Sequence, residues 1–242
     1  MKQILSFTLL TVIIISYQTI SGQDKKPVVY LIPGQGADYR LFKNLEIDSV
    51  FEVKHVHYFT PEKGLNMTDY ARALSNQIDT TKTFYLVGVS LGGMLATEMG
   101  DFLKPEKIIV ISSAKNRYEF PFRYRFQKKI PLYKIVPQGM VKLGAQILQP
   151  IVEPASRLEK ETTKAMLKDK DKAFLKRTIK MILEWEREEY REDIIHIHGD
   201  NDHTIPHRNV KQDFLIEGGS HMMILTRAYV IGDIINHILL QP

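Results

Sequence analysis

The stretch Thr83-Phe84-Tyr85-Leu86-Val87-Gly88-Val89-Ser90-Leu91-Gly92 decides how this sequence is interpreted. It begins with an aromatic and β-branched run typical of a buried strand, and the residues after it are typical of the start of a helix. A serine in so tight a turn takes a strained backbone conformation, and only glycines two residues to either side avoid collisions with neighbouring backbone. The turn lifts the Ser90 hydroxyl to a helix N-terminus, where free N–H groups favour negative charge. The motif alone also fits a glycine-rich turn with an inert serine.

Three other segments contain the residue types that an activated serine needs. An apolar strand predicted at 28–32 ends in Pro33-Gly34-Gln35-Gly36. A later predicted strand leads into the loop 200–206, which contains two aspartates, and the loop 217–222 contains His221. Together with G-x-S-x-G, these segments resemble the α/β-hydrolase superfamily, in which this motif is the nucleophile elbow and the chain order is serine, acid, histidine.

The resemblance implies a catalytic group made of Ser90, Asp202 and His221, and an oxyanion hole made of the backbone N–H groups of Gln35 and Leu91. In the family, the loop after the first strand has an H-G-x pattern and supplies one of the two oxyanion donors. Pro33 stands here where the family usually has that histidine. This departure leaves the identity of the first donor less well defined than that of the second.

Two aspartates compete for the role of the acid. The family pattern after the strand is G-x-x-D-x-x-x-P, and Asp202 matches this spacing between Gly199 and Pro206, whereas Asp200 does not. The acid must accept the N–H of the histidine, fix its tautomer and stabilise the imidazolium. We therefore predict that Asp202 is the acid and that Asp200 is a carboxylate of the loop.

The remaining histidines have no motif to support them. His196 and His198 are two residues apart on a predicted strand, so that both point to one face of the sheet. That spacing could serve a metal ion, but no third ligand is recognisable, and we interpret the pair as packed or hydrogen-bonded side chains. The others lie in the acid loop, on the second predicted strand and in the last predicted helix: His203, His207, His55, His57 and His237.

Predicted strands and helices alternate along the chain, which favours an α/β fold with a mostly parallel six-stranded sheet and helices on both faces. The strands are predicted at 28–32, 50–57, 83–88, 106–112, 193–198 and 210–216, and amphipathic helices at 67–79 and 222–240. The segment Pro206–Val210 is too short for an ordinary helix between the last two strands. The two antiparallel strands that often open the α/β-hydrolase fold are expected to be absent.

About 80 residues separate the fourth and fifth predicted strands, far more than one crossover helix requires. The resemblance places a helical cap at this point. We therefore divide the chain into a signal peptide (1–22), a core (23–113 and 191–242) and a cap (114–190). Aromatic residues alternate with cations at 115–129, and a final cap helix is predicted at 171–189. These residues could wall an acyl pocket with a basic rim, or pack on the core with solvated cations outside; we favour the second interpretation.

The N-terminus is predicted to lie outside the fold. A short basic start, an apolar run at 4–15 and small residues near the end resemble a Sec-type signal peptide cleaved after Ser21 or Gly22. The apolar run is shorter than the roughly 20 residues of a membrane span. We expect export to the periplasm or the extracellular space, with an uncleaved inner-membrane anchor as the alternative. The chain has no cysteine, which excludes disulfides, a thiol nucleophile and a lipid-modified cysteine.

The composition is that of a globular protein, with 44% hydrophobic residues, 25% charged residues and a modest net charge of +5. No nucleic-acid-binding module is recognisable, whereas weak contact with an anionic membrane surface is compatible with the charge. We expect a small-molecule ester or acyl substrate, hydrolysed through an acyl-enzyme on Ser90, with no metal or organic cofactor; the oligomeric state is not indicated. The alternatives are a non-catalytic envelope binding protein on the same fold and a lipase-like or thioesterase-like acyl hydrolase at a membrane surface.

Overall fold

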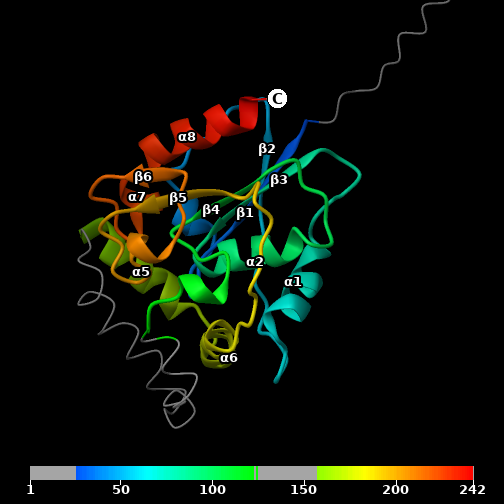
Figure 1. Ribbon diagram of the computed structural model, residues 1–242, viewed down its shortest axis with the longest axis vertical. Coiled ribbons are helices and arrows are strands. Elements are labelled where there is room, and N and C mark those ends of the chain that lie inside the picture. The colour runs from blue at the N-terminus through cyan, green and yellow to red at the C-terminus, as the bar shows by residue number, and fades with distance from the viewer. Residues whose placement is uncertain (1–25, 123, 125–156, 242) are drawn as a thin grey trace, which may run out of the picture.

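The computed structural model describes residues 26–122, 124 and 157–241. Within them, one sheet of six strands has the order β2-β1-β3-β4-β5-β6, and every pair of neighbours is parallel (Figure 1). The expected fold class is therefore confirmed. The strands are β1 (Val28–Ile32), β2 (Glu52–His55), β3 (Phe84–Val89), β4 (Ile108–Ile111), β5 (Ile195–Gly199) and β6 (Phe214–Ile216).

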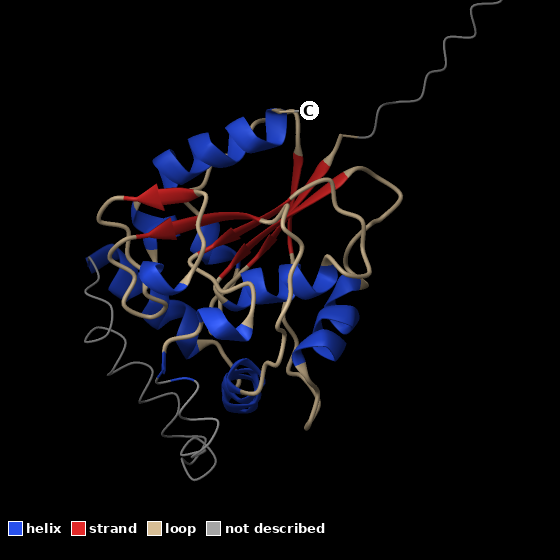
Figure 2. Cartoon of the chain, viewed as in Figure 1, coloured by secondary structure: helices blue, strands red, loops and turns tan. Residues whose placement is uncertain are grey.

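Helices lie on both sides of the twisted sheet (Figure 2). One side is covered by α1 (Met67–Ser75) and α2 (Leu91–Met99), and the other by α7 (Met223–Thr226), α8 (Ala228–Leu240) and a 3-10 helix at Tyr39–Phe42. Two further helices, α5 (Arg157–Lys168) and α6 (Lys172–Leu183), belong to the segment expected to form the cap. Short 3-10 helices also occur at Arg117–Glu119 and His207–Asn209.

Alternation along the strands divides the core into two layers. In β1 every residue is buried, with Val28, Tyr30 and Ile32 facing the layer under α1 and α2. Val29 and Leu31 face the opposite layer, under α7 and α8. Because successive side chains of a strand point to opposite faces, an almost continuous apolar run is what a strand covered on both faces requires.

The order of the strands determines where a ligand can bind. β1 and β3 are neighbours, and the chain leaves β1 toward β2 on one side and leaves β3 toward β4 on the other. Loops that depart in opposite directions leave a crevice at the carboxyl ends of such strands. The two loops at this point are residues 33–36 after β1 and the turn at Ser90 after β3. The topology therefore brings the two segments singled out in the sequence to one place.

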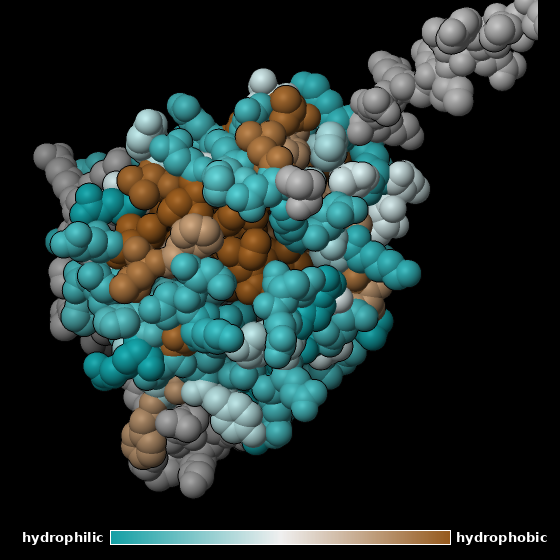
Figure 3. All heavy atoms as spheres, turned by 45° about the horizontal axis from the view of Figure 1, so that its top comes forward, coloured by the Kyte–Doolittle hydropathy of each residue, from teal (hydrophilic) through white to brown (hydrophobic). Residues whose placement is uncertain are grey.

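A 3-10 helix, His207–Asn209, lies between β5 and β6, where the sequence left too few residues for an ordinary helix. Apolar side chains of β6 and α8 remain open to solvent, including Leu215 of β6 and Tyr229, Val230 and Leu240 of α8. Figure 3, in which the top of Figure 1 comes forward, shows apolar side chains gathered on this part of the surface.

Several elements are shorter than predicted, each for a local reason. The strand expected at 210–216 begins only at Phe214, because the 3-10 helix His207–Asn209 takes up the chain before it; the carboxylate of Asp213 accepts the backbone N–H of His196 (2.8 Å). The helix expected at 171–189 ends at Leu183, where the chain turns so that the Trp185 indole reaches the interior. The helix expected at 222–240 is two helices, separated at Arg227 by a non-helical backbone conformation.

The expected signal peptide at 1–22 lies outside the described residues, as do residues 123 and 125–156 of the expected cap, which include part of the aromatic and cationic segment. Among the helices of the described part, none has the length and apolar character needed to cross a lipid bilayer.

Candidate active site

Ser90 occupies a strained turn between β3 and α2. Its backbone dihedrals are φ 52° and ψ −118°, a conformation that residues other than glycine rarely adopt. Both backbone polar groups of Ser90 are hydrogen-bonded. Its N–H donates to the carbonyl of Ile111 (3.0 Å), and its carbonyl accepts the Ser113 hydroxyl (2.7 Å). Strain of this kind persists only where neighbouring structure enforces it, and it is frequent at functional sites.

The flanking glycines are required by close backbone approach. A Cβ on Gly88 would lie 2.3 Å from the carbonyl oxygen of Gly92, and a Cβ on Gly92 would lie 2.1 Å from that of Ile32. Real Cβ atoms do not approach an oxygen so closely. The steric reason inferred from the sequence for the two glycines of the motif therefore holds in the structure.

The structure brings Ser90, His221 and Asp202 together in a line. Nε2 of His221 lies 3.0 Å from Oγ of Ser90, and Nδ1 of the same ring lies 2.8 Å from Oδ2 of Asp202. Because a carboxylate only accepts hydrogen bonds, the ring donates its Nδ1–H to Asp202 and keeps the Nε2 lone pair toward the serine hydroxyl. This is the arrangement in which a histidine can take a proton from a serine.

The carboxylate of Asp202 is fully buried and surrounded by N–H donors. Its Oδ1 accepts the backbone N–H groups of Thr204 (2.9 Å) and Ile205 (2.7 Å), and its Oδ2 accepts from His221. Burial alone raises the pKa of Asp202, but the charge and hydrogen bonds of His221 and the hydrogen bond of His198 outweigh it, and the pKa lies well below its usual range. Asp202 is therefore an anion at neutral pH.

Asp200 has a different place in the same loop. Its Oδ1 accepts the backbone N–H of Gly218 (2.7 Å), and the N–H of Asn201 donates to the carbonyl of Gly219 (3.0 Å). These bonds fasten the acid loop to the loop that carries His221. Asp200 thus positions backbone, while Asp202 is the aspartate that contacts the histidine ring.

The loop after β1 lies directly against Ser90. A Cβ on Gly34 would be 3.4 Å from the Cβ of Ser90, and Gln35 lines the same cavity as the serine. The Gln35 side chain also reaches Thr178 of α6 (3.5 Å), while the Tyr58 hydroxyl donates to the carbonyl of Pro33. Leu91, fully buried, is the first residue of α2, so its N–H is one of those that a helix leaves without an intrahelical partner.

Ser90 and His221 open into a cavity of about 340 Å³. Its walls come from the loop after β1, from α2 and from both described helices of the expected cap. The apolar side chains among the described lining residues include Leu41, Met94, Phe120, Met166, Leu167, Ile179, Ile182 and Leu183. No Asp, Glu, Lys or Arg lines the cavity in the described part of the chain.

No protein-family model matches this sequence, and neither does any curated protein. Solved structures do resemble it in fold. An esterase from Thermogutta terrifontis aligns over 89% of this chain and 89% of its own, with TM-score 0.63 and 15% identity. The enol-lactonase from Burkholderia xenovorans aligns over 91% and 94% (TM-score 0.65, 14% identity), and a bromoperoxidase from Bacillus anthracis over 89% and 92% (TM-score 0.64, 16% identity). The chain has the α/β-hydrolase fold.

The other histidines make contacts of a different kind. His203 contacts Asn201 and His207 contacts the carbonyl of Asp200, both near the surface, and His237 contacts Gln241. His196 and His198 are buried and hydrogen-bonded to each other (3.0 Å), in line with the interpretation made from their spacing. The described residues include no group of three His, Cys, Asp or Glu that could hold a metal ion.

Nothing in the sequence indicated two contacts that hold the backbone around Ser90. Ser113 holds the carbonyl of Ser90 from the segment just after β4, and Tyr58 holds the carbonyl of Pro33 from the segment after β2. Each joins residues more than 20 positions apart, so neither periodicity nor a motif could have shown it.

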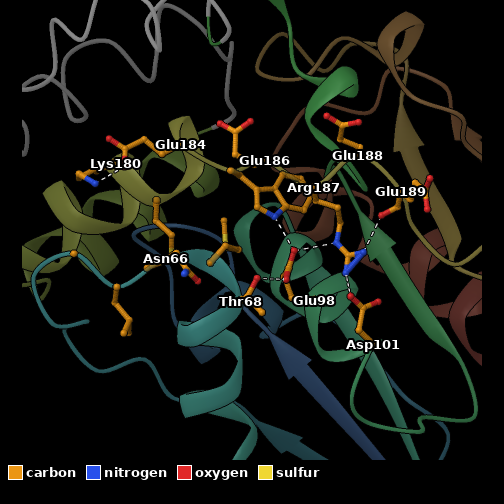
Figure 4. A pocket seen from close by; sticks show the side chains of 15 residues that line it. Asn66, Thr68, Glu98, Asp101, Lys180, Glu184, Glu186, Arg187, Glu188 and Glu189 are labelled. Carbon is orange, nitrogen blue, oxygen red and sulfur yellow. Dashed lines mark hydrogen bonds and ion pairs between the residues drawn. The ribbon is translucent and has the colours of Figure 1, made fainter.

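A larger cavity, of about 630 Å³, lies away from Ser90 beside the outer part of α2 (Figure 4). It is lined by many carboxylates, but several of them are already paired. The buried carboxylate of Glu98 accepts from Thr68 (2.6 Å), from the Trp185 indole (2.8 Å) and from Arg187 (2.9 Å). Arg187 also pairs with Asp101. This cluster therefore fastens the chain returning from the cap to the helix that follows Ser90.

Replacing Glu98 by alanine should destabilise the fold by about 2 kcal/mol, because the buried Trp185 N–H loses its acceptor and the mostly buried Arg187 guanidinium keeps only Asp101 and the carbonyl of Glu189. Glu98→Gln, which keeps an acceptor of the same size, should cost clearly less. Urea unfolding followed by circular dichroism measures both. A loss below about 1 kcal/mol for the alanine variant would show that the cluster does not fasten this segment.

Proposed function

We propose that this chain is a serine hydrolase that cleaves carboxylic esters. The observation that carries the proposal is the line of contacts from Ser90 Oγ through His221 to Asp202, at 3.0 and 2.8 Å, in a strained turn that opens into an apolar cavity. The esterases among the structures of similar fold support the same class of reaction.

In the first half of the reaction, Ser90 Oγ forms a bond to the ester carbonyl carbon while its proton passes to Nε2 of His221. The tetrahedral intermediate then collapses, the bond to the alcohol oxygen breaks, and the alcohol leaves with the proton from His221. In the second half, water attacks the acyl-enzyme, gives its proton to His221 and releases the carboxylic acid, and Ser90 regains the proton. Asp202 orients the ring and stabilises its cationic form throughout.

We assign the oxyanion hole to the backbone N–H groups of Gln35 and Leu91. The close packing of Gly34 on Ser90 and the position of Leu91 at the start of α2 support this assignment. The Thr178 contact to Gln35 and the Tyr58 contact to Pro33 hold the loop in place. A donor of this kind lowers the barrier by about 3 kcal/mol.

The cavity favours a neutral substrate with an apolar acyl group. Its described walls are mainly Leu, Ile, Met and Phe side chains without a charged partner for an anionic or cationic substituent. Because burying an unpaired charge is costly, charged acyl groups should be excluded from it. Short and medium acyl chains fit a cavity of this size better than a long lipid chain, which argues against the lipase-like alternative.

The test of this function is labelling of the purified protein with a fluorophosphonate, followed by hydrolysis of p-nitrophenyl esters of graded acyl length. We expect stoichiometric labelling of Ser90, seen by peptide mass, and turnover of acetate to octanoate esters. A protein that remains unlabelled and inactive while folded would instead be a binding protein on this fold.

Enlarging a wall residue should change acyl-chain preference. Ile179 lies on α6 and lines the cavity, so Ile179→Trp should fill space that a longer acyl group needs. We expect kcat/KM for p-nitrophenyl octanoate to fall at least about tenfold relative to that for the acetate. Lys172→Trp, at the exposed start of the same helix, is the matched control and should leave the ratio unchanged. An equal loss on both esters would place the acyl group elsewhere.

A further inference from the structure

Behind the acid of the proposed site lies a second pair of histidines, one of which contacts Asp202. His198 is completely buried on β5, and its Nε2 lies 3.3 Å from Oδ2 of Asp202 and 2.8 Å from the carbonyl oxygen of Ile205. Its Nδ1 lies 3.0 Å from Nε2 of His196, which is also completely buried. A continuous chain of contacts thus runs from Ser90 through His221, Asp202 and His198 to His196.

The surroundings of His196 determine which ring nitrogens carry protons. Burial moves the pKa of His196 well below its ordinary value, and the nearby Lys115 cation acts in the same direction, so this ring is neutral and has one N–H. Nδ1 of His196 is buried, and although the Lys211 backbone lies near the ring, no acceptor meets Nδ1 in hydrogen-bonding geometry. A proton on Nδ1 would be an orphaned buried donor, which is rare in proteins, whereas a proton on Nε2 is donated to His198.

The assignment for His198 follows. Its Nδ1 must accept the proton from His196, so that its own N–H lies on Nε2, facing two oxygen acceptors, Ile205 O and Asp202 Oδ2. In this state His198 is neutral. It adds a hydrogen bond to the carboxylate without adding a positive charge that would compete with His221.

We propose that His198 is a positioning residue for Asp202: locked by His196 in its Nε2–H tautomer, it holds the carboxylate oxygen that accepts from His221. The inference rests on the proposed function, in which Asp202 orients His221. Because one oxygen, Oδ2, contacts both rings, the position of the carboxylate relative to His221 depends on both. The two backbone donors on Oδ1 fix the other end of the same group.

Other charged groups lie around the histidine pair, and their charges affect the pH dependence of the site. The buried Lys115 donates through Nζ to the carbonyl of Lys211, and the carboxylate of Glu119 accepts the backbone N–H groups of both residues. Asp213 accepts the N–H of His196. Burial lowers the pKa of Lys115 and raises that of Glu119. These groups face the His196 side, whereas Asp202 and His221 face the His198 side.

The test compares His198→Leu, which removes the donor, with His198→Gln, whose amide N–H₂ can reach the position of Nε2. For His198→Leu we expect kcat on p-nitrophenyl acetate to fall about tenfold with little change in KM, because the defect lies in orientation and not in substrate binding. With one donor fewer on Asp202, its charge acts more strongly on His221. The acidic limb of the kcat/KM profile should therefore move to higher pH. His198→Gln should restore most of kcat and the original profile.

A folded His198→Leu protein with wild-type kcat and an unshifted pH profile would overturn the proposal, as would a Gln variant as impaired as the Leu variant. If both variants fail to fold, nitrogen-15 NMR of the wild-type protein tests the proposal by showing which ring nitrogen of His198 carries a proton. We expect Nε2 of His198 to be protonated and Nδ1 not; a protonated Nδ1 would refute the assignment. The NMR measurement needs no turnover, so that an inactive wild-type protein would count against the ester hydrolase and not against the histidine arrangement.

Discussion

Ser90→Ala should abolish ester hydrolysis, with kcat/KM falling roughly 10⁴-fold or more. The same loss is expected for His221→Ala, and the double variant should be no worse than either single one, because the two side chains act as one unit through their 3.0 Å contact. Steady-state kinetics on p-nitrophenyl acetate, with circular dichroism as the folding control, measure the effect. Additive losses in the double variant would mean that the two residues do not act on the same step.

The two aspartates of the acid loop provide a matched comparison within this prediction. Asp202→Asn should lower kcat by roughly 10⁴-fold, since an amide no longer stabilises the imidazolium or the correct tautomer. Asp200→Asn should have a mild effect, because its side-chain oxygen still accepts the N–H of Gly218. If Asp200→Asn proved the worse of the two, the assignment of the acid would be wrong.

Gly92→Ala should cost more than about 4 kcal/mol of stability and yield little folded protein, the largest structural effect we expect of a single methyl group here. The added Cβ would lie 2.1 Å from the carbonyl oxygen of Ile32, and both atoms belong to backbone fixed by the sheet and by α2. Neither can move without separating β1 from the turn. Soluble yield and urea unfolding provide the measurement.

Gly34→Ala is the matched control for this steric effect. It places a methyl group in the same crevice, but its nearest neighbours lie at 3.4 and 3.5 Å, which are ordinary contact distances, and Gly34 is not among the glycines with positive φ. It should therefore change stability by less than about 1 kcal/mol. Similar stability of the two variants would show that the approach of Gly92 to β1 is not what requires a glycine.

Local chemistry made part of this site predictable. The turn at Ser90 could be predicted because its requirements, a strand, two glycines and a helix start, lie within a few residues of one another. The choice of Asp202 over Asp200 followed from spacing to Gly199 and Pro206, and the structure places Asp202 beside His221. The starts of the last strand and the last helix were less predictable, because they depend on the 3-10 helix His207–Asn209 and on the non-helical backbone at Arg227.

The sequence by itself determined the alternating strands and helices, the strained serine turn and the identity of three polar residues in a fixed order, because each depends on near neighbours in the chain. Only the tertiary structure decided that these residues meet at the carboxyl edge of β1 and β3, since that depends on strand order. It also decided which side chains support them. Tyr58 on Pro33, Ser113 on Ser90 and His198 on Asp202 depend on where separate segments meet in the fold, and residue spacing does not encode that.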